Sequence, residues 1–68
     1  MNKINKNPKV QILLATYNGE RFLRGQLDSI VNQEYNFWEL LIHDDGSIDD
    51  TIKILKEYEN KYPKQIRL

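Results

Sequence analysis

Two short apolar runs, each followed by a polar turn, set the pattern of the chain. VQILLA (Val10–Ala15) is followed by TYNG, and WELLIH (Trp38–His43) is followed by DDGS. Uninterrupted apolar runs of this length between turn residues indicate buried strands. A third run, QIRL (Gln65–Leu68), looks like the start of another strand.

Between these runs, apolar residues recur every three or four positions, which is typical of one face of a helix. The first such segment extends from Glu20 to about Gln33, with the apolar residues Phe22, Leu23, Leu27, Ile30 and Val31. The second has Ile48, Thr51, Ile52, Leu55, Tyr58 and Tyr62 on one stripe and ends before Pro63. We expect Asn18 to cap the first helix, and Ser47 with Asp50 to form a capping box on the second.

The order is β-α-β-α-β with short loops, which predicts the α/β class. Both complete strands are apolar on both faces, as expected for a parallel sheet covered by helices, and right-handed crossovers would place the three strands side by side. A chain of 68 residues buries only about 60% of its unfolded surface. We therefore expect a truncated half of a doubly wound sheet, with residues 1–8 as a leader and residues 9–68 as the folded part.

Composition narrows the possible partners. Ten basic and ten acidic residues give a net charge of zero, which argues against a nucleic-acid partner. The basic leader with Lys3, Lys6 and Lys9 is interpreted as solvated rather than as a membrane-surface patch. There is no cysteine for disulfides or thiolate metal sites, and no apolar run approaches the ~20 residues of a membrane span.

Candidate chemistry lies where the two strands end. Ligands of doubly wound sheets bind outside the carboxyl ends of the strands, here Ala15–Asn18 and His43–Gly46. The Tyr17 ring can stack on a base, and Asp44 or Asp45 can accept a hydrogen bond from a base N–H or a ribose hydroxyl. This set suits a nucleoside better than a phosphate, which would need a divalent cation as a bridge.

Each of these residues also has a structural interpretation. Aspartates after a strand are commonly turn formers and helix caps, and we assign Asp49 and Asp50 to that role. Asp44 and Asp45 precede the expected cap, which makes them better functional candidates. His43 is expected to be structural or exposed rather than catalytic.

Other motifs fail on spacing. The chain has neither the glycine pattern of a dinucleotide site nor a P-loop, and DDGSIDD has the glycine and glutamate of a calcium loop misplaced. A receiver domain would have its acidic pair after the first strand, where ATYN stands.

TYNG, SIVNQ and DDGS at these separations resemble the N-terminus of the family 2 inverting glycosyltransferases, from about Lys9 to Leu68. The sequence is most similar to the branch with rhamnosyltransferase-like members that build bacterial surface polysaccharides. The resemblance implies a GT-A fold, a UDP- or dTDP-sugar donor, a saccharide or lipid-linked acceptor, and Mg²⁺ or Mn²⁺ as cofactor. It also implies that the enzyme is located in the cytoplasm or at the inner face of the membrane.

The resemblance further implies which residues bind the nucleotide. The family's nucleotide-binding P-T-Y-N segment falls on Ala15, Thr16, Tyr17 and Asn18, with its base-contacting roles on Thr16 and Tyr17. Its aspartate pair falls on Asp44 and Asp45. The second aspartate, Asp45, is the one expected to bind the uracil or thymine ring. Glu20 is expected near the site.

The family's metal-binding D-x-D motif and catalytic base lie beyond the positions that these 68 residues match. We therefore expect no catalytic or metal-binding residue in this chain, no sugar transfer by the chain alone, and the C-terminal remainder of its own domain as a partner. The alternative is a stand-alone nucleotide-binding or interaction module without catalysis.

Overall fold

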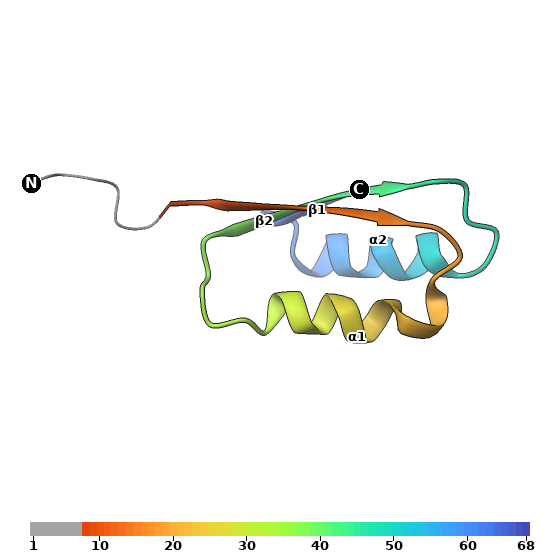
Figure 1. The fold of residues 1–68 in the computed structure, drawn as a ribbon, viewed down its shortest axis with the longest axis horizontal. Helices are drawn as coiled ribbons and strands as arrows, with labels where there is room; N and C mark the ends of the chain where they lie inside the picture. The colour runs from red at the N-terminus through yellow and green to blue at the C-terminus, as the bar shows by residue number, and fades with distance from the viewer. Residues whose placement is uncertain (1–7) are drawn as a thin grey trace, which may run out of the picture.

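A computed structural model describes residues 8–68 and shows the predicted order of strands and helices (Figure 1). The elements are β1 (Val10–Thr16), α1 (Glu20–Val31), β2 (Trp38–Asp44), α2 (Thr51–Lys61) and β3 (Ile66–Arg67). The predicted α/β class is confirmed. Of the expected leader, only Pro8 belongs to the described residues, and Lys3 and Lys6 lie outside them.

The three strands form one parallel sheet in the order β1-β2-β3. β1 and β2 pair over their full length, from Val10 opposite Trp38 to Thr16 opposite Asp44. β3 is short and pairs only at its two residues. The prediction that consecutive strands lie side by side is confirmed, and the carboxyl ends of β1 and β2 therefore meet at one edge of the sheet.

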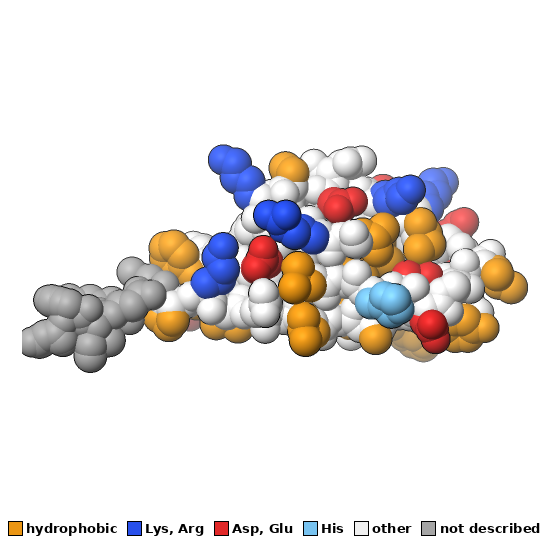
Figure 2. Space-filling model, turned by 90° about the horizontal axis from the view of Figure 1, so that it is seen from above, with side chains coloured by type: hydrophobic (Ala, Val, Ile, Leu, Met, Phe, Trp, Pro, Cys, Tyr) orange, Lys and Arg blue, Asp and Glu red, His pale blue; other side chains and the backbone are white. Residues whose placement is uncertain are grey.

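Both helices cover the same face of the sheet, so the described residues form two layers (Figure 1). The core between the layers consists of Leu23, Leu27, Trp38, Leu40, Ile42, Ile54, Leu55, Tyr58 and Ile66. Within residues 8–68 the other face of the sheet has no helix over it, and Leu13 on that face is 74% exposed. Hydrophobic side chains appear in the middle of that uncovered face when the molecule is seen from above (Figure 2).

Successive residues of a strand point to opposite faces of the sheet, which divides β1 and β2 into two sets. The helix-covered set contains Ile12, Leu14, Thr16, Leu40, Ile42 and Asp44, and all of these are buried or half-buried. The uncovered set contains Leu13, Ala15, Leu41 and His43, and all but the half-buried Leu41 are exposed. We call the second surface the open face.

Polar side chains link the two helices. The Tyr58 hydroxyl donates to Asp28 Oδ1 at 2.5 Å, and this bond, followed by burial, raises the pKa of Tyr58. An exposed ion pair joins Arg24 and Glu57 at 3.1 Å. These links hold α1 and α2 beside each other, one from the core residue Tyr58 and one on the surface.

Two residues of the helical pattern differ from expectation. Phe22 and Ile48 are 74% and 91% exposed, although the repeat placed both on buried stripes. Ile48 precedes α2, which begins at Thr51, and Ile54 is buried instead.

Candidate nucleoside-binding edge

Five hydrogen bonds join the segment from the turn after β1 to the start of α1 with the segment from the loop after β2 to the start of α2. Three start in the first turn: Asn18 N to Ser47 Oγ (2.8 Å), Gly19 N to Thr51 Oγ1 (2.9 Å) and Glu20 N to Asp49 Oδ2 (3.3 Å). Two run the opposite way: Ile48 N to Asn18 Oδ1 (2.9 Å) and Asp50 N to Glu20 Oε1 (3.1 Å). The side-chain oxygens of Asn18, Glu20 and Ser47 therefore accept hydrogen bonds from the opposite segment, and these bonds fix the position of one segment against the other.

These bonds explain why both predicted caps are wrong. Gly19, not Asn18, is the N-cap of α1, and Asn18 takes a left-handed conformation with φ of 47° that short polar residues tolerate. Asp50 stands at the N-cap of α2 without a side-chain capping bond. Ser47 lies in the loop, so the capping box does not form. The turn-forming role assigned to Asp49 is confirmed, because its Oδ1 accepts from Thr51 N at 2.9 Å.

Asp44 organises the loop after β2. Its Oδ1 accepts from Thr16 Oγ1 and from Ser47 Oγ, each at 2.6 Å. Its Oδ2 accepts from Ser47 N at 2.8 Å and from Gly46 N at 3.1 Å. The hydroxyls of Ser47 and Thr16 and the two backbone N–H groups lower the pKa of Asp44 to about 2. The loop also needs a φ of 89° at position 46, which glycine adopts without strain.

Asp45 differs from its neighbour. Its backbone N donates to Thr16 O at 2.9 Å, which fixes the residue against the end of β1. Its side chain is exposed, and within residues 8–68 no hydrogen bond or ion pair engages the carboxylate. Tyr17, 63% exposed, follows β1 as Asp45 follows β2. The structure therefore brings an available aromatic ring and an available carboxylate to one edge of the sheet.

The other predicted site residues lie around this pair. Ala15 is exposed on the open face, and Thr16 is only 8% exposed with its hydroxyl committed to Asp44. Glu20 is exposed on the first turn of α1 and bonds to the loop after β2. All six predicted residues thus gather at the carboxyl edge, but Thr16, Glu20 and Asp44 use polar groups to hold the two segments together.

The carboxyl edge of the sheet carries a cluster of carboxylates, and we call it the acidic edge. Its carboxylates belong to Glu20, Asp44, Asp45, Asp49 and Asp50. Across the part of the chain that the structure describes, no three His, Cys, Asp or Glu side chains are grouped so that they could hold a metal ion. Asp44 already uses both carboxylate oxygens in the loop, so these residues do not by themselves fit a divalent metal.

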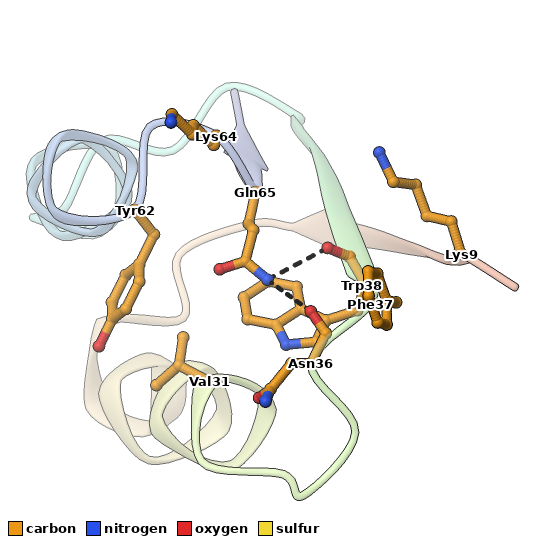
Figure 3. Close-up of a pocket in the computed structure, with 8 residues that line it drawn as sticks. All are labelled: Lys9, Val31, Asn36, Phe37, Trp38, Tyr62, Lys64 and Gln65. Atoms are coloured by element: carbon orange, nitrogen blue, oxygen red, sulfur yellow. Dashed lines mark hydrogen bonds between the residues drawn. The ribbon is translucent and has the colours of Figure 1, made fainter. Parts of the chain in front are cut away.

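A hollow of about 500 Å³ lies at the opposite, amino end of the strands (Figure 3). It is lined by Lys9, Val31, Asn36, Phe37, Trp38, Tyr62, Lys64 and Gln65. The Gln65 amide donates to the backbone oxygens of Asn36 (3.1 Å) and Trp38 (3.4 Å), which links β3 to the entrance of β2. No motif in the sequence indicated this hollow, because its lining comes from four separate segments. It contains no carboxylate, so it does not share the chemistry of the acidic edge.

Comparison with known proteins identifies the class. Residues 11–68 match the family described as "Glycosyl transferase family 2". This match covers most of the chain and includes both turns of the acidic edge. The chain belongs to glycosyltransferase family 2.

Three relatives are similar over most of the chain. "Putative glycosyltransferase EpsE" of Bacillus subtilis (strain 168) is 42% identical over 65 residues, covering 96% of this chain and 23% of the relative. "Minor teichoic acid biosynthesis protein GgaA" of the same organism is 37% identical over 60 residues, covering 84% and 14%. "dTDP-rhamnosyl transferase RfbG" of Shigella flexneri is 40% identical over 55 residues, covering 81% and 19%. The chain thus spans less than a quarter of the length of each of these relatives.

No solved structure matches the chain. Within residues 8–68, neither helix has the length and apolar character needed to cross a membrane.

Proposed function

We propose that the chain forms the nucleoside-binding part of an inverting glycosyltransferase of the GT-A fold that uses a UDP- or dTDP-sugar. The acceptor in this proposal is a saccharide or a lipid-linked saccharide of a bacterial surface polymer, and the reaction takes place in the cytoplasm or at the inner face of the membrane. Similarity to a teichoic acid biosynthesis protein and to a dTDP-rhamnosyl transferase supports the polymer and the rhamnosyltransferase-like branch.

The observation that carries this proposal is that the exposed side chains of Tyr17 and Asp45 follow neighbouring strands at the same edge of the sheet. The tyrosine ring is exposed enough to stack on a pyrimidine, and stacking of a base on an aromatic ring contributes about 1–3 kcal/mol. The Asp45 carboxylate then accepts a hydrogen bond from the ring N–H of uracil or thymine. A bond to a charged acceptor is stronger than one between neutral groups, so Asp45 contributes both affinity and base selectivity.

Thr16, Asp44 and Glu20 act indirectly in this proposal. The Asp44 carboxylate fixes the loop that presents Asp45, and Thr16 ties that carboxylate to β1. Glu20 holds the same loop from the other side through Asp50 N. Ala15 leaves room on the open face for the base, because its side chain is a single methyl group.

The diphosphate and the sugar of the donor need partners that this edge does not provide. Two or more phosphate charges next to five carboxylates would be repelled without a cation. A divalent metal bound through a D-x-D motif elsewhere in the enzyme would supply that charge, and the C-terminal remainder of the domain would supply the catalytic base. The part played by these 68 residues is to bind and orient the nucleoside.

Calorimetric titration with UDP and dTDP tests this role. The Asp45→Asn variant keeps the shape of the side chain and loses the charge, and we expect it to bind about ten- to a hundred-fold more weakly. Its melting temperature should stay near that of wild type, because the carboxylate is exposed and makes no bond to another described residue. Asp50→Asn removes the same charge from the same loop and should bind as wild type does. Equal affinity of wild type and Asp45→Asn would reduce Asp45 to a turn residue.

A further inference from the structure

We propose that His43 is a second base-reading residue, which donates a hydrogen bond to a carbonyl oxygen of the uracil or thymine that Asp45 binds. The inference rests on the proposed function and adds a residue that determines which base is accepted. In this proposal His43 donates a hydrogen bond to the base, and Asp45 accepts one from it.

The position of His43 in the sheet leads to this assignment. His43 is the last residue of β2 on the open face, directly opposite Ala15 of β1 in the parallel register. Tyr17 follows Ala15 by two residues, and Asp45 follows His43 by two residues. With a rise of ~3.3 Å per residue, the backbones of His43 and Asp45 are about 7 Å apart, so both side chains can reach one small ring.

The surface beside His43 is suited to hold the ring of a base. A hollow of about 330 Å³ on the open face is lined by Leu13, Leu14, Ala15, Leu41, Ile42 and His43. Its other five lining residues are apolar, so His43 is the polar group that closes this hollow toward the acidic edge. A base lying over Ala15 would cover apolar surface with its flat side while its polar margin faces the carboxyl edge. The imidazole is exposed, and within residues 8–68 it makes no hydrogen bond or ion pair.

The chemistry of the base completes the argument. Uracil and thymine present a carbonyl oxygen, a ring N–H and a second carbonyl oxygen in a row. The Asp45 carboxylate can only accept, and a neutral imidazole has one N–H to donate, so the two side chains match an N–H and its neighbouring carbonyl. Cytosine has a bare ring nitrogen and an amino group at the same two positions. It would place a lone pair against Asp45 and a donor against the N–H of His43.

Two variants test whether the N–H donor of His43 contributes to binding of the base. His43→Leu keeps a side chain of similar size without a donor, and His43→Gln restores an N–H donor. By calorimetry we expect UDP to bind His43→Leu about three- to ten-fold more weakly than wild type, with affinity largely recovered in His43→Gln. The preference for UDP over CDP should fall in His43→Leu. Glu34→Gln, in the exposed loop at the opposite end of the sheet, is the matched control and should bind as wild type does.

Nuclear magnetic resonance gives a second, direct measurement. His43 is the chain's single histidine, so its imidazole signals are assigned without ambiguity. Saturating UDP should shift the ring nitrogen signals, whereas CDP at the same concentration should leave them near their free positions. These signals can be followed in wild type and therefore do not depend on the folding of a variant.

The outcomes distinguish the two proposals. If wild type binds UDP but His43→Leu binds it equally well and the imidazole signals do not move, the role of His43 is overturned and the proposed function stands. If wild type binds neither UDP nor dTDP at millimolar concentration, the proposed function is overturned and the role of His43 with it. UDP-dependent imidazole shifts together with weaker binding by His43→Leu would support both.

Discussion

The two faces of the sheet are built from the same strands, yet they carry different kinds of residue. The covered face ends in Thr16 and Asp44, whose side chains bond to each other, and the Asp44 carboxylate also bonds to the loop. The open face ends in Ala15 and His43 and continues into Tyr17 and Asp45, whose side chains are exposed. Because side chains alternate between faces, adjacent residues such as Asp44 and Asp45 are separated in role: one holds the loop and the other faces solvent.

This contrast changes how a pair of aspartates is interpreted. Two adjacent carboxylates would repel each other if both faced the same ligand, but here one accepts four hydrogen bonds and its pKa lies near 2. The negative charge of Asp44 is therefore neutralised in part by donors within the loop. Asp45 remains available to a ligand on the other side of the strand.

The largest effect should come from removing a covered residue. Leu40 is fully buried in the middle of β2, and Leu40→Ala should lower the free energy of unfolding by about 2–5 kcal/mol, which is a large part of the stability of a chain this short. Leu13→Ala, on the open face at 74% exposure, should change it by less than about 0.5 kcal/mol. Urea denaturation of both variants measures the difference. A similar loss in both would show that the open face contributes as much to folding as the covered face.

A smaller effect is expected from Asp44→Asn, and it should depend on pH. The folded-state pKa of Asp44 is about 2, below its ordinary value of 3.8, so ionised Asp44 stabilises the fold. That contribution is fully present above about pH 4 and is lost as the pH falls toward 2. Asp44→Asn should thus be less stable than wild type at pH 6, and the gap should narrow between pH 4 and pH 2. Thermal melts across this range measure the gap, and a gap independent of pH would contradict the assignment.

The smallest effect should come from Asp49→Asn. Asp49 accepts hydrogen bonds from Glu20 N and Thr51 N, and an asparagine can replace only one of its two acceptor oxygens. We expect a slightly lower urea midpoint and an affinity for UDP within about two-fold of wild type, because Asp49 does not face the proposed base. Calorimetry on this variant shows whether losing a carboxylate from the acidic edge matters by itself. A loss of UDP affinity as large as that expected for Asp45→Asn would show that the overall charge of the edge, rather than one residue, governs binding.

The sequence predicted the fold more completely than the site. Strand and helix order followed from apolar periodicity, and Trp38 and Leu27 are buried as that pattern requires. The caps were mispredicted because local rules consider only neighbours in sequence. Asn18 and Ser47 instead bond to each other's segments across 29 and 30 positions. The face left open was also not predictable from periodicity, since an apolar strand gives the same pattern whether one face or both are covered.

The position of Trp38 has an optical consequence. It is the chain's single tryptophan, 4% exposed, and it lies at the start of β2. Six residue steps of ~3.3 Å separate it from Asp44, so about 20 Å lie between the indole and the acidic edge. Its fluorescence therefore reports whether the helices are closed over the sheet, while a nucleotide bound at the far end is too distant to contact the ring. The chain carries separate spectroscopic reporters for folding and for ligand, with the indole at one end of a strand and the imidazole at the other.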